Sequence, residues 1–373
     1  MLIGVDASRA LRARRTGTEN YSLQLIRHLL LAGVEHRFRL YCDQVPAQEV
    51  FGAHRVDGDG TKSEVRAMPF PRLWTHLRLS WELTLNPPDV LFIPAHVLPL
   101  VHPQRSVCTI HDLGYWKHPE AHTRGQRAYL DWSTRWNARQ SAHLVVDSEA
   151  TKVDLVARYG VPTEKMSVVY PGRDETLVPV SDEALRSSLR SRLGLGQRYL
   201  LYVGTLQPRK NLVRLVEAFS QMRDGGLQLV LAGQRGWMAD PIFRRVEELA
   251  LTDAVVFPGY VQEADLPVLL SSAIGFAFPS LHEGFGFPVL EAQACGTPVV
   301  ASNISSVPEV AGDGAQYVDP YDTASIAAGL ERVVHDEALR MALRERGLAN
   351  VQRFSWRRAA SETLTILERV GGA

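Results

Sequence analysis

Cysteine is scarce in this chain of 373 residues. The three cysteines, Cys42, Cys108 and Cys295, are odd in number and far apart in the sequence. This pattern fits neither a disulfide framework nor a zinc site built from paired cysteines. We therefore expect a protein of a reducing compartment, the cytoplasm.

Long apolar runs and a net charge are also missing. No run reaches the roughly 18 apolar residues of a membrane-spanning helix, and residues 1–6 lack a basic start followed by a long apolar core. Lysine plus arginine and aspartate plus glutamate number 41 each, so the overall charge gives no indication of a nucleic-acid partner. The sequence predicts a protein that is soluble or at most lies on a membrane surface.

Short apolar runs alternate with amphipathic helical segments along the whole chain. Continuous apolar strands separated by helices predict an α/β fold with parallel sheets covered on both faces. The expected strands are residues 2–5, 38–41, 90–93, 106–110, 144–146 and 167–169, and then 199–203, 228–231, 255–257, 274–278, 298–301 and 315–318. The length favours two domains, and the proline and glycine of residues 170–175 indicate a junction there. We expect domains at 1–175 and 176–355.

One loop combines two carboxylates with a glycine turn. Glu283 follows the expected strand 274–278, and Glu291 lies in a helix that we expect to begin near Pro288 and to end near Gly296. Between the two acids, the backbone amides of Gly284, Phe285 and Gly286 can approach an anion closely, because two of these residues lack a Cβ. The loop is suited to hold a phosphate between two carboxylates that bind hydroxyl groups. The alternative is a pair of acids that only complement the helix dipole.

Two further segments place polar side chains after expected strands. Arg209 and Lys210 follow Gly204 and precede a helix, where positive charge is unfavourable unless an anion binds there. They can equally be a solvated basic pair. His111 and Asp112 follow the strand 106–110, where Asp112 can cap a turn while His111 packs locally, or His111 can serve as a titratable site residue.

A loop with several arginines is expected after the first strand. Residues 14–20 include Arg14, Arg15 and Gly17, and we expect a helix from residue 21 to residue 31. Thr18 and Glu19 are compatible with simple capping, and the arginines with a solvated face.

The run from Glu283 to Ala292 resembles the signature of retaining glycosyltransferases of family 4, in which seven residues separate two glutamates. Three other segments match in the same order: residues 204–211, residues 257–261, and His111 with Asp112. The resemblance covers nearly the whole chain. It implies a GT-B fold, with two Rossmann-like domains whose parallel sheets face each other across a cleft, and a last helix from about residue 356 that packs back on the N-terminal domain.

The resemblance also implies roles for individual residues. The C-terminal domain is expected to bind the sugar nucleotide and the N-terminal domain the acceptor. Glu291 matches the carboxylate on the nucleotide ribose, Glu283 the one on the donor sugar, Lys210 the lysine on the diphosphate, and His111 the histidine near the reacting sugar. The expected catalytic residues are His111 and Glu283, and the expected donor-binding residues are Lys210, Arg209, Glu283, Gly284, Phe285, Gly286, Glu291, Gly204, Tyr260, Val261 and Gly17.

The sequence departs from the family pattern at two positions. Thr205 stands where many members carry an arginine that binds phosphate, and Arg209 is a candidate to supply that charge. Gly17 is followed by Thr18, where many members have paired glycines.

The expected chemistry follows from charge. Departure of a nucleoside diphosphate builds negative charge on phosphate, which Lys210, Arg209 and the loop amides can stabilise without a metal or other cofactor. Retention requires either same-face attack, which we favour, or a covalent intermediate on Glu283.

The expected donor is GDP-mannose, with UDP-glucose as the alternative, because the segment 205–212 and the loop at His111 are similar to those of bacterial mannosyltransferases of polysaccharide and O-antigen assembly. The expected acceptor is a glycan or glycolipid. The helix-like stretch 72–83, with its arginines and tryptophans, together with Arg9, Arg12, Arg14 and Arg15, suggests peripheral membrane contact through the N-terminal domain. Core tryptophans with a solvated basic face are the alternative.

Other classes of protein fit the sequence less well than a glycosyltransferase. A sugar-nucleotide epimerase shares the architecture, but the sequence around His111 and Glu283 shows no match to its catalytic pattern. The absence of Gly-x-Gly-x-x-Gly after the first strand argues against a nicotinamide oxidoreductase. A non-enzymatic nucleotide-binding module is a further alternative, and the oligomeric state is open.

Overall fold

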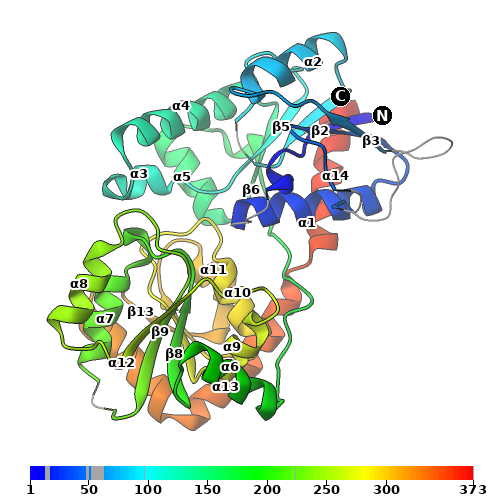
Figure 1. Ribbon diagram of the computed structural model, residues 1–373. Helices are drawn as coiled ribbons and strands as arrows, with labels where there is room; N and C mark the ends of the chain where they lie inside the picture. The colour runs from blue at the N-terminus through cyan, green and yellow to red at the C-terminus, as the bar shows by residue number, and fades with distance from the viewer. Residues whose placement is uncertain (13–16, 48–49, 52–62, 96, 223, 373) are drawn as a thin grey trace. The chain divides into compact units, whose positions relative to one another are not determined.

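The computed structural model describes residues 1–12, 17–47, 50–51, 63–95, 97–222 and 224–372. These residues form two compact units (Figure 1). The first unit contains Met1–Trp116, Thr123–Gly172 and Phe354–Ala373, and the second contains Lys117–His122 and Arg173–Arg353. The chain therefore enters the second unit briefly at Lys117–His122, leaves the first unit again after Gly172 and returns to it at Phe354.

The first unit is built on a parallel sheet of seven strands in the order β3-β2-β1-β4-β5-β6-β7. The strands are β1 (Leu2–Asp6), β2 (Arg37–Cys42), β3 (Ser63–Ala67), β4 (Val90–Ile93), β5 (Ser106–Ile110), β6 (His143–Val146) and β7 (Met166–Val168). All were expected from apolar runs except β3. That strand lies at the edge of the sheet, and all five of its residues are only partly buried, so its sequence has no apolar run.

Helices cover this sheet. They are α1 (Gly17–Ala32), α2 (Ser80–Leu85), α3 (Gly114–Lys117), α4 (Arg124–Gln140), α5 (Glu149–Tyr159) and α14 (Trp356–Gly372), with short helical turns η1 (Arg9–Leu11), η2 (Thr75–Leu79) and η4 (Thr163–Lys165). Helix α5 shows why the chain is helical there: the Ser148 side chain accepts a hydrogen bond from the Thr151 amide at its start, and Gly160 ends it in the left-handed conformation. The expectation of a helix beginning at residue 21 is wrong, since α1 begins at Gly17.

The last helix, α14, belongs to the first unit, beside α1 (Figure 1). Its first residue, Trp356, packs edge-on against Tyr21 of α1, with ring centroids 5.7 Å apart. Near its other end, a Cβ added to Gly371 would meet the Met1 sulfur at 2.8 Å and Val90 at 3.3 Å. Helix α14 thus packs beside α1 on the strands β4, β5 and β6, and its end lies near the start of the chain.

The second unit has a parallel sheet of six strands in the order β10-β9-β8-β11-β12-β13. The strands are β8 (Arg198–Val203), β9 (Leu227–Ala232), β10 (Val255–Gly259), β11 (Gly275–Phe278), β12 (Val299–Ser302) and β13 (Ala315–Val318), all of them expected from the sequence. The helices are α6 (Glu183–Leu193), α7 (Leu212–Ser220), α8 (Asp240–Glu248), α9 (Leu266–Ser272), α10 (Phe287–Ala294), α11 (Val307–Ala311), α12 (Thr323–His335) and α13 (Glu337–Asn350), with the turns η3 (Pro119–Ala121), η5 (Pro208–Lys210), η6 (Gly312–Gly314) and η7 (Val351–Arg353).

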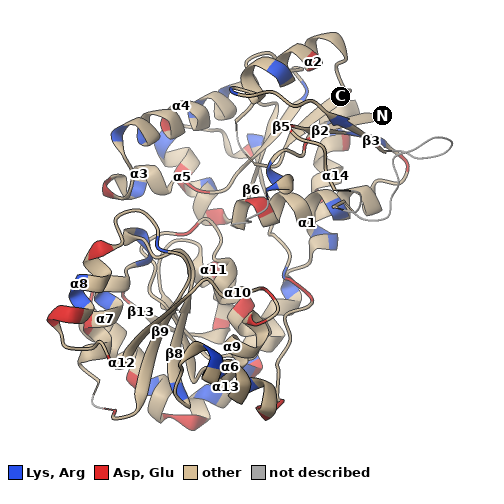
Figure 2. Ribbon diagram, viewed as in Figure 1, with Lys and Arg blue, Asp and Glu red and all other residues tan. Residues whose placement is uncertain are grey.

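Most charged residues lie on the helices and loops rather than in the strands. Figure 2 shows the strands of both units mainly in tan, with the ribbon coloured blue or red for basic and acidic residues mostly on the helices and loops. The three cysteines are free and buried. Within the described part of the chain, no helix has both the length and the apolarity needed to cross a membrane.

Both sheets reverse their strand order beside their first strand. The reversal lies between β1 and β4 in the first unit and between β8 and β11 in the second. In open parallel sheets, ligands bind outside the carboxyl ends of the strands at such a reversal. The residues that follow β8 and β11 therefore lie where a ligand site of the second unit is expected.

Candidate functional site

A buried ion pair joins the segments that follow β8 and β11. The Nζ atom of Lys210 lies 2.5 Å from Oε1 of Glu283, and Nη1 of Arg209 lies 3.4 Å from Oε2 of the same carboxylate. Arg209 Nη1 also donates a hydrogen bond of 2.5 Å to the carbonyl of His282. Lys210 and Glu283 are 8% and 6% exposed, so the solvated basic pair considered from the sequence is wrong for Lys210.

The two cations set the charge of Glu283. Burial alone raises the pKa of this carboxyl group, but the attraction of Lys210 and Arg209 and the hydrogen bond from Lys210 outweigh it, so the pKa is lowered. Lys210 also lies over the ring of Phe278, with Nζ 5.3 Å from the ring centroid. Glu283 is therefore ionised at neutral pH and held at a fixed place at the carboxyl end of β11.

Three polar residues that the sequence reasoning missed brace the Glu283 loop. Ser305 accepts a hydrogen bond from the Glu283 amide at 3.1 Å and donates one to the Glu283 carbonyl at 2.7 Å. Ser306 donates to the carbonyls of Glu283 and Phe285 at 3.0 and 2.8 Å. Asn211 donates to the carbonyls that follow β11 and β13, those of Pro279 and Pro320. Their place in the sequence indicates such a role for both serines, because they closely follow the expected strand 298–301 at the same edge of the sheet.

The glycine turn leads directly into α10. Gly286 has φ of +108°, a conformation that residues with a Cβ rarely adopt, and a Cβ at this position would meet no atom within 4 Å. Helix α10 begins at Phe287 with Pro288 in its first turn, as expected. Gly284 and Phe285 are buried in the turn. The turn thus has the backbone conformation and the open side that close approach of an anion requires.

Glu291 differs from Glu283 in its surroundings. It is partly buried on α10, and no side chain among the described residues forms an ion pair or hydrogen bond with its carboxyl group. Burial, together with repulsion from Asp174, raises its pKa to about 7. A carboxyl group with this pKa is poised to change its protonation near neutral pH or to accept hydroxyl groups of a ligand.

Other expected donor residues lie at the same edge of the sheet. Gly204 ends β8 with φ of +149°, and a Cβ there would lie 2.7 Å from the Tyr202 hydroxyl oxygen. Tyr260 and Val261 follow β10, two strands away from β8, and the Tyr260 side chain is exposed. No contact between these two residues and the Lys210–Glu283 pair is recorded in the part of the chain that the structure describes.

The first unit places a second titratable pair at the carboxyl ends of β5 and β6. Nδ1 of His111 lies 2.6 Å from Oδ2 of Asp147, and Nε2 lies 3.1 Å from the carbonyl oxygen of Pro94, which follows β4. Tyr21 packs edge-on against the imidazole, with ring centroids 4.8 Å apart. Since both ring nitrogens face acceptors, the protonated imidazole fits this environment best.

The same groups shift the pKa of His111. Burial lowers it, but the charge and hydrogen bond of Asp147, the charge of Asp112 and the carbonyl of Pro94 outweigh burial and raise it. Asp112 itself accepts a hydrogen bond from the Gly114 amide at 2.8 Å, which is the capping role considered for it from the sequence. Asp147, which the sequence analysis did not select, is the partner that fixes the His111 ring.

The basic segment after β1 is only partly described. Arg14 and Arg15 lie outside the described residues, and Gly17 is the exposed first residue of α1 rather than part of a loop. Arg12 pairs with Asp43 at 2.5 Å, and Arg9 pairs with Glu19 at 3.6 Å. Across the described residues, no group of three or more histidine, cysteine, aspartate or glutamate side chains is arranged to hold a metal ion.

Comparison with known proteins identifies this arrangement. The model of the family "Glycosyl transferases group 1" matches residues 186–349, and that of "Glycosyltransferase Family 4" matches residues 15–177. The O-antigen chain mannosyltransferase B of Escherichia coli is 29% identical over 376 residues, covering 96% of this chain and 98% of that protein. The O-antigen chain mannosyltransferase RfbU of Salmonella typhimurium is 29% identical over 64% of this chain and 63% of its own length.

Solved structures share the fold at low sequence identity. Sucrose-phosphate synthase from Thermosynechococcus elongatus superposes with a TM-score of 0.75 at 21% identity, covering 100% of this chain and 99% of its own. HepE of Anabaena, in a complex with UDP and glucose, superposes with a TM-score of 0.72 at 18% identity, covering 100% of this chain and 98% of its own. WaaG, a glycosyltransferase of lipopolysaccharide biosynthesis, gives 0.73 at 16% identity over the full length of both chains.

The two parallel sheets and these matches define a GT-B glycosyltransferase. The expected fold class is thereby confirmed. Since the two family models together span most of the sequence, the chain belongs to glycosyltransferase family 4.

Proposed function

We propose that this glycosyltransferase moves a mannosyl group from GDP-mannose to a saccharide or a lipid-linked saccharide, with retention at the anomeric carbon. The observation that carries the proposal is the buried Lys210–Glu283 pair at the reversal of strand order, with Glu291 on the helix that follows. The O-antigen mannosyltransferases among its relatives support mannose as the sugar.

In this proposal the two carboxylates have different partners. Glu283, ionised and fixed by two cations, accepts hydrogen bonds from hydroxyl groups of the donor sugar. Glu291, which has no side-chain partner among the described residues, accepts them from the ribose. An ammonium group has three N–H donors, so Lys210 can bind Glu283 and a phosphate oxygen at the same time.

The leaving group is a nucleoside diphosphate, and its negative charge grows as the glycosidic bond breaks. Lys210 and the amides of the Gly284–Gly286 turn supply fixed positive charge and dipoles, the usual source of the largest catalytic effect. Arg209 lies beside Lys210 and can supply the charge that Thr205 lacks. Metal-independent transfer is the corresponding proposal.

Retention by same-face attack is the mechanism that we favour. The departing phosphate oxygen takes the proton of the acceptor hydroxyl, which attacks on the side that the phosphate leaves. Both oxygens of Glu283 face cations, at 2.5 and 3.4 Å, which lowers the basicity of this carboxylate as a nucleophile. Detection of a glycosyl adduct on Glu283 by mass spectrometry would overturn this preference in favour of the covalent route.

A UDP-glucose donor is the second candidate. HepE of Anabaena has this fold and was solved with UDP and glucose. Calorimetric titration with GDP, UDP and ADP discriminates the two donors, and a preference for UDP would overturn the first choice.

The test of function is a screen of sugar nucleotides monitored by nucleotide release, repeated with Glu283→Ala and Lys210→Ala. Ser272→Ala on α9 is the matched control, because its hydroxyl bonds the Val268 carbonyl of its own helix and the side chain of Tyr199 near the amino end of β8, and neither belongs to the candidate site. We expect both site variants to lose activity while the control retains it. Equal activity in all four proteins would show that the site is wrong, and an epimerised sugar nucleotide formed without acceptor would favour an epimerase.

We also propose that the first unit contacts anionic lipid. Four apolar side chains recur every four residues: Leu73, Leu77, Trp81 and Leu85, which are 65%, 51%, 64% and 59% exposed. Trp74 is buried, so the alternative of a core tryptophan is correct for that residue. Glu82 is buried and bonded to Arg78, so the acid does not face the lipid, while Arg72 is exposed. An apolar stripe flanked by arginines is typical of interfacial helices.

Co-sedimentation with vesicles of phosphatidylglycerol or phosphatidylcholine tests this contact. We expect binding to the anionic vesicles that Leu77→Ser/Trp81→Ser abolishes and Val153→Ser, a change at an exposed residue of α5, leaves intact. Sedimentation independent of both lipid charge and variant would rule the contact out.

A further inference from the structure

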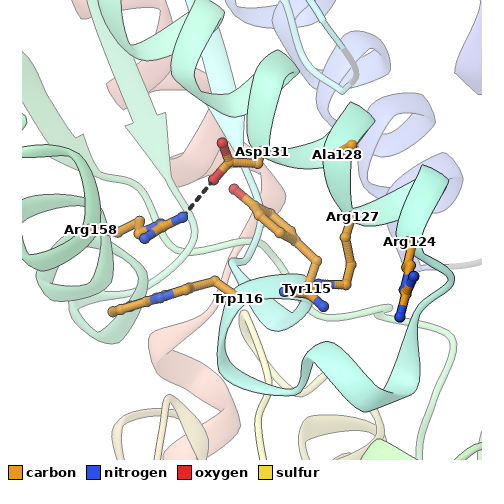
Figure 3. Close-up of a pocket in the computed structure, with 7 residues that line it drawn as sticks. All are labelled: Tyr115, Trp116, Arg124, Arg127, Ala128, Asp131 and Arg158. Atoms are coloured by element: carbon orange, nitrogen blue, oxygen red, sulfur yellow. Dashed lines mark hydrogen bonds and ion pairs between the residues drawn. The ribbon is translucent and has the colours of Figure 1, made fainter.

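A hollow of about 300 Å³ opens on the first unit, separate from every residue assigned above (Figure 3). Its lining comes from α3, α4 and α5 and consists of Tyr115, Trp116, Arg124, Arg127, Ala128, Asp131 and Arg158. All these residues belong to one unit, so the hollow is complete within it. Three arginines against one aspartate make its lining strongly basic.

The aspartate is already neutralised. Asp131 accepts hydrogen bonds from Arg158 at 2.9 Å, from Arg135 at 3.3 Å and from the Tyr159 hydroxyl at 2.9 Å. Burial raises its pKa, but these partners outweigh burial and lower it, so the group stays ionised at neutral pH. Since two guanidinium groups share one carboxylate, Asp131 leaves no negative charge to attract a cation.

Arg124 and Arg127 carry the uncompensated charge. Both are exposed in the first two turns of α4, and neither has an ion-pair partner among the residues that the structure describes. Figure 3 shows their side chains leaving α4 in the same direction, toward the segment that carries Tyr115 and Trp116. Two positive charges near the amino end of a helix are unfavourable unless an anion binds between them.

Arg158 forms the fixed side of the hollow. Its guanidinium lies over the rings of Trp116 and Tyr159, 5.7 Å from each centroid, and one nitrogen is bound to Asp131. The Tyr159 hydroxyl is in turn 2.7 Å from that of Tyr115. This network orients Arg158 in advance, so its remaining N–H groups are available without loss of side-chain entropy.

We propose that the hollow binds a phosphate or diphosphate group of the acceptor. Guanidinium groups bind phosphate oxygens in pairs, and three of them around one small hollow provide the donors and the charge for such a group. The volume lies at the lower end of the range for small-molecule sites. The inference rests on the proposed transfer of a sugar to a saccharide and assigns that acceptor to the phosphorylated class.

Binding of inorganic pyrophosphate to the full-length protein is the first test. Calorimetry is done with GDP present in saturating amount, so that the donor site is occupied. We expect Arg124→Gln/Arg127→Gln to weaken pyrophosphate binding at least about tenfold, or about 1.4 kcal/mol, and Arg139→Gln at the far end of α4 to leave it unchanged. GDP affinity should be equal in all three proteins, which also shows that the variants are folded.

Acceptor kinetics identify the source of the phosphate. A saccharide on a lipid diphosphate, a sugar phosphate and a neutral saccharide are compared in the parent and the double variant. In the double variant, we expect KM to rise for the phosphorylated acceptors with kcat nearly unchanged. A rise confined to the saccharide on a lipid diphosphate assigns the hollow to a lipid-linked acceptor. A rise for this acceptor and for the sugar phosphate assigns the hollow to phosphorylated saccharides in general.

Two results would overturn the proposal. One is equal pyrophosphate affinity in the double variant and in Arg139→Gln, and the other is a KM for the neutral saccharide that rises as much as the others. Loss of pyrophosphate binding in the double variant, in a protein that transfers sugar to none of the acceptors, would support the hollow as an anion site and refute the proposed function instead.

Discussion

Lys210 and Glu283 are 73 residues apart in the chain, yet the lysine Nζ lies 2.5 Å from the glutamate Oε1. The pair connects the segments that leave β8 and β11, the two neighbouring strands at which the order of the second sheet reverses. It therefore fixes the two sides of the candidate donor site relative to each other, besides supplying charge.

This pair gives a prediction about stability. We expect Lys210→Met to lower the free energy of unfolding by about 3 to 5 kcal/mol, because it leaves a buried carboxylate without its main partner. The double variant Lys210→Met/Glu283→Gln should lose less than the sum of the two single variants. Urea denaturation of the four proteins measures this coupling, and additive losses would mean that the two side chains do not interact.

Glu291 gives a prediction about pH. Its pKa is raised from 4.5 to about 7, so the folded protein holds a proton that the unfolded chain has released, and stability falls as pH rises from about 4.5 to 7. The loss is complete above pH 7 and amounts to about 3 kcal/mol. We expect Glu291→Gln to be more stable than the parent at pH 8 and equal to it at pH 4, by thermal unfolding. The same difference at both pH values would contradict the raised pKa.

His111 gives a spectroscopic prediction. In the parent its pKa is raised from 6.5, so its contribution to stability is present below pH 6.5 and is lost as pH rises through the folded pKa. In Asp147→Asn, burial prevails and the pKa of His111 should fall below that of the parent. Histidine NMR titration measures both values, with Asp112→Asn as a control that removes a more weakly acting charge. An unchanged pKa in Asp147→Asn would exclude Asp147 as the positioning residue.

Ser306 is fully buried, and its hydroxyl serves two loop carbonyls, those of Glu283 and Phe285. We expect Ser306→Ala to cost about 1 to 2 kcal/mol of stability, since a buried acceptor loses its donor, and to raise KM for the donor because the glycine turn loosens. Ser272→Ala removes a hydroxyl that bonds Val268 and Tyr199, so it can lower stability but should leave KM for the donor unchanged. If the donor kinetics of Ser306→Ala equal those of the parent, Ser306 does not contribute to the donor site.

Gly172 tests the packing of α14. A Cβ at this position would lie 2.1 Å from the backbone nitrogen of Trp356, so Gly172→Ala must displace the start of the helix. Gly125→Ala on α4 meets no atom within 4 Å and should be neutral or stabilise by about 0.5 to 1 kcal/mol. Thermal unfolding compares them, and equal melting temperatures would show that the chain adjusts at Gly172 without strain.

Apolar runs predicted the buried strands well, because a parallel strand that is covered on both faces is apolar along most of its length. The exception, β3, is an edge strand whose five residues are all only partly buried, and a search for apolar runs overlooks such a strand. The start of α1 at Gly17 was missed because glycine and threonine favour a loop by local preference, and because the buried residues of the helix begin only at Tyr21.

Glu283, Lys210 and His111 were selected from the sequence because each follows an expected strand, and Glu291 because it lies in the helix after the glycine turn. The resemblance to family 4 supplied their expected roles. Their partners were less visible. Asp147, Ser305 and Ser306 take part through contacts with residues 22 to 36 positions away, and such pairing depends on strand order, which one sequence does not specify.

The contact between Gly172 and Trp356 has a consequence for synthesis and for domain separation. The chain departs from the first unit and rejoins it at one spot, since the ring of Tyr170 also lies 5.9 Å from that of Phe354. The part of the second unit from Arg173 to Arg353 is therefore an insertion with adjacent ends, whereas Lys117–His122 joins this unit from an earlier part of the chain. On the ribosome this insertion can fold before the residues that complete the first unit have been made. A short linker from residue 172 to residue 354 should yield the first unit as a separate protein that still carries Lys117–His122.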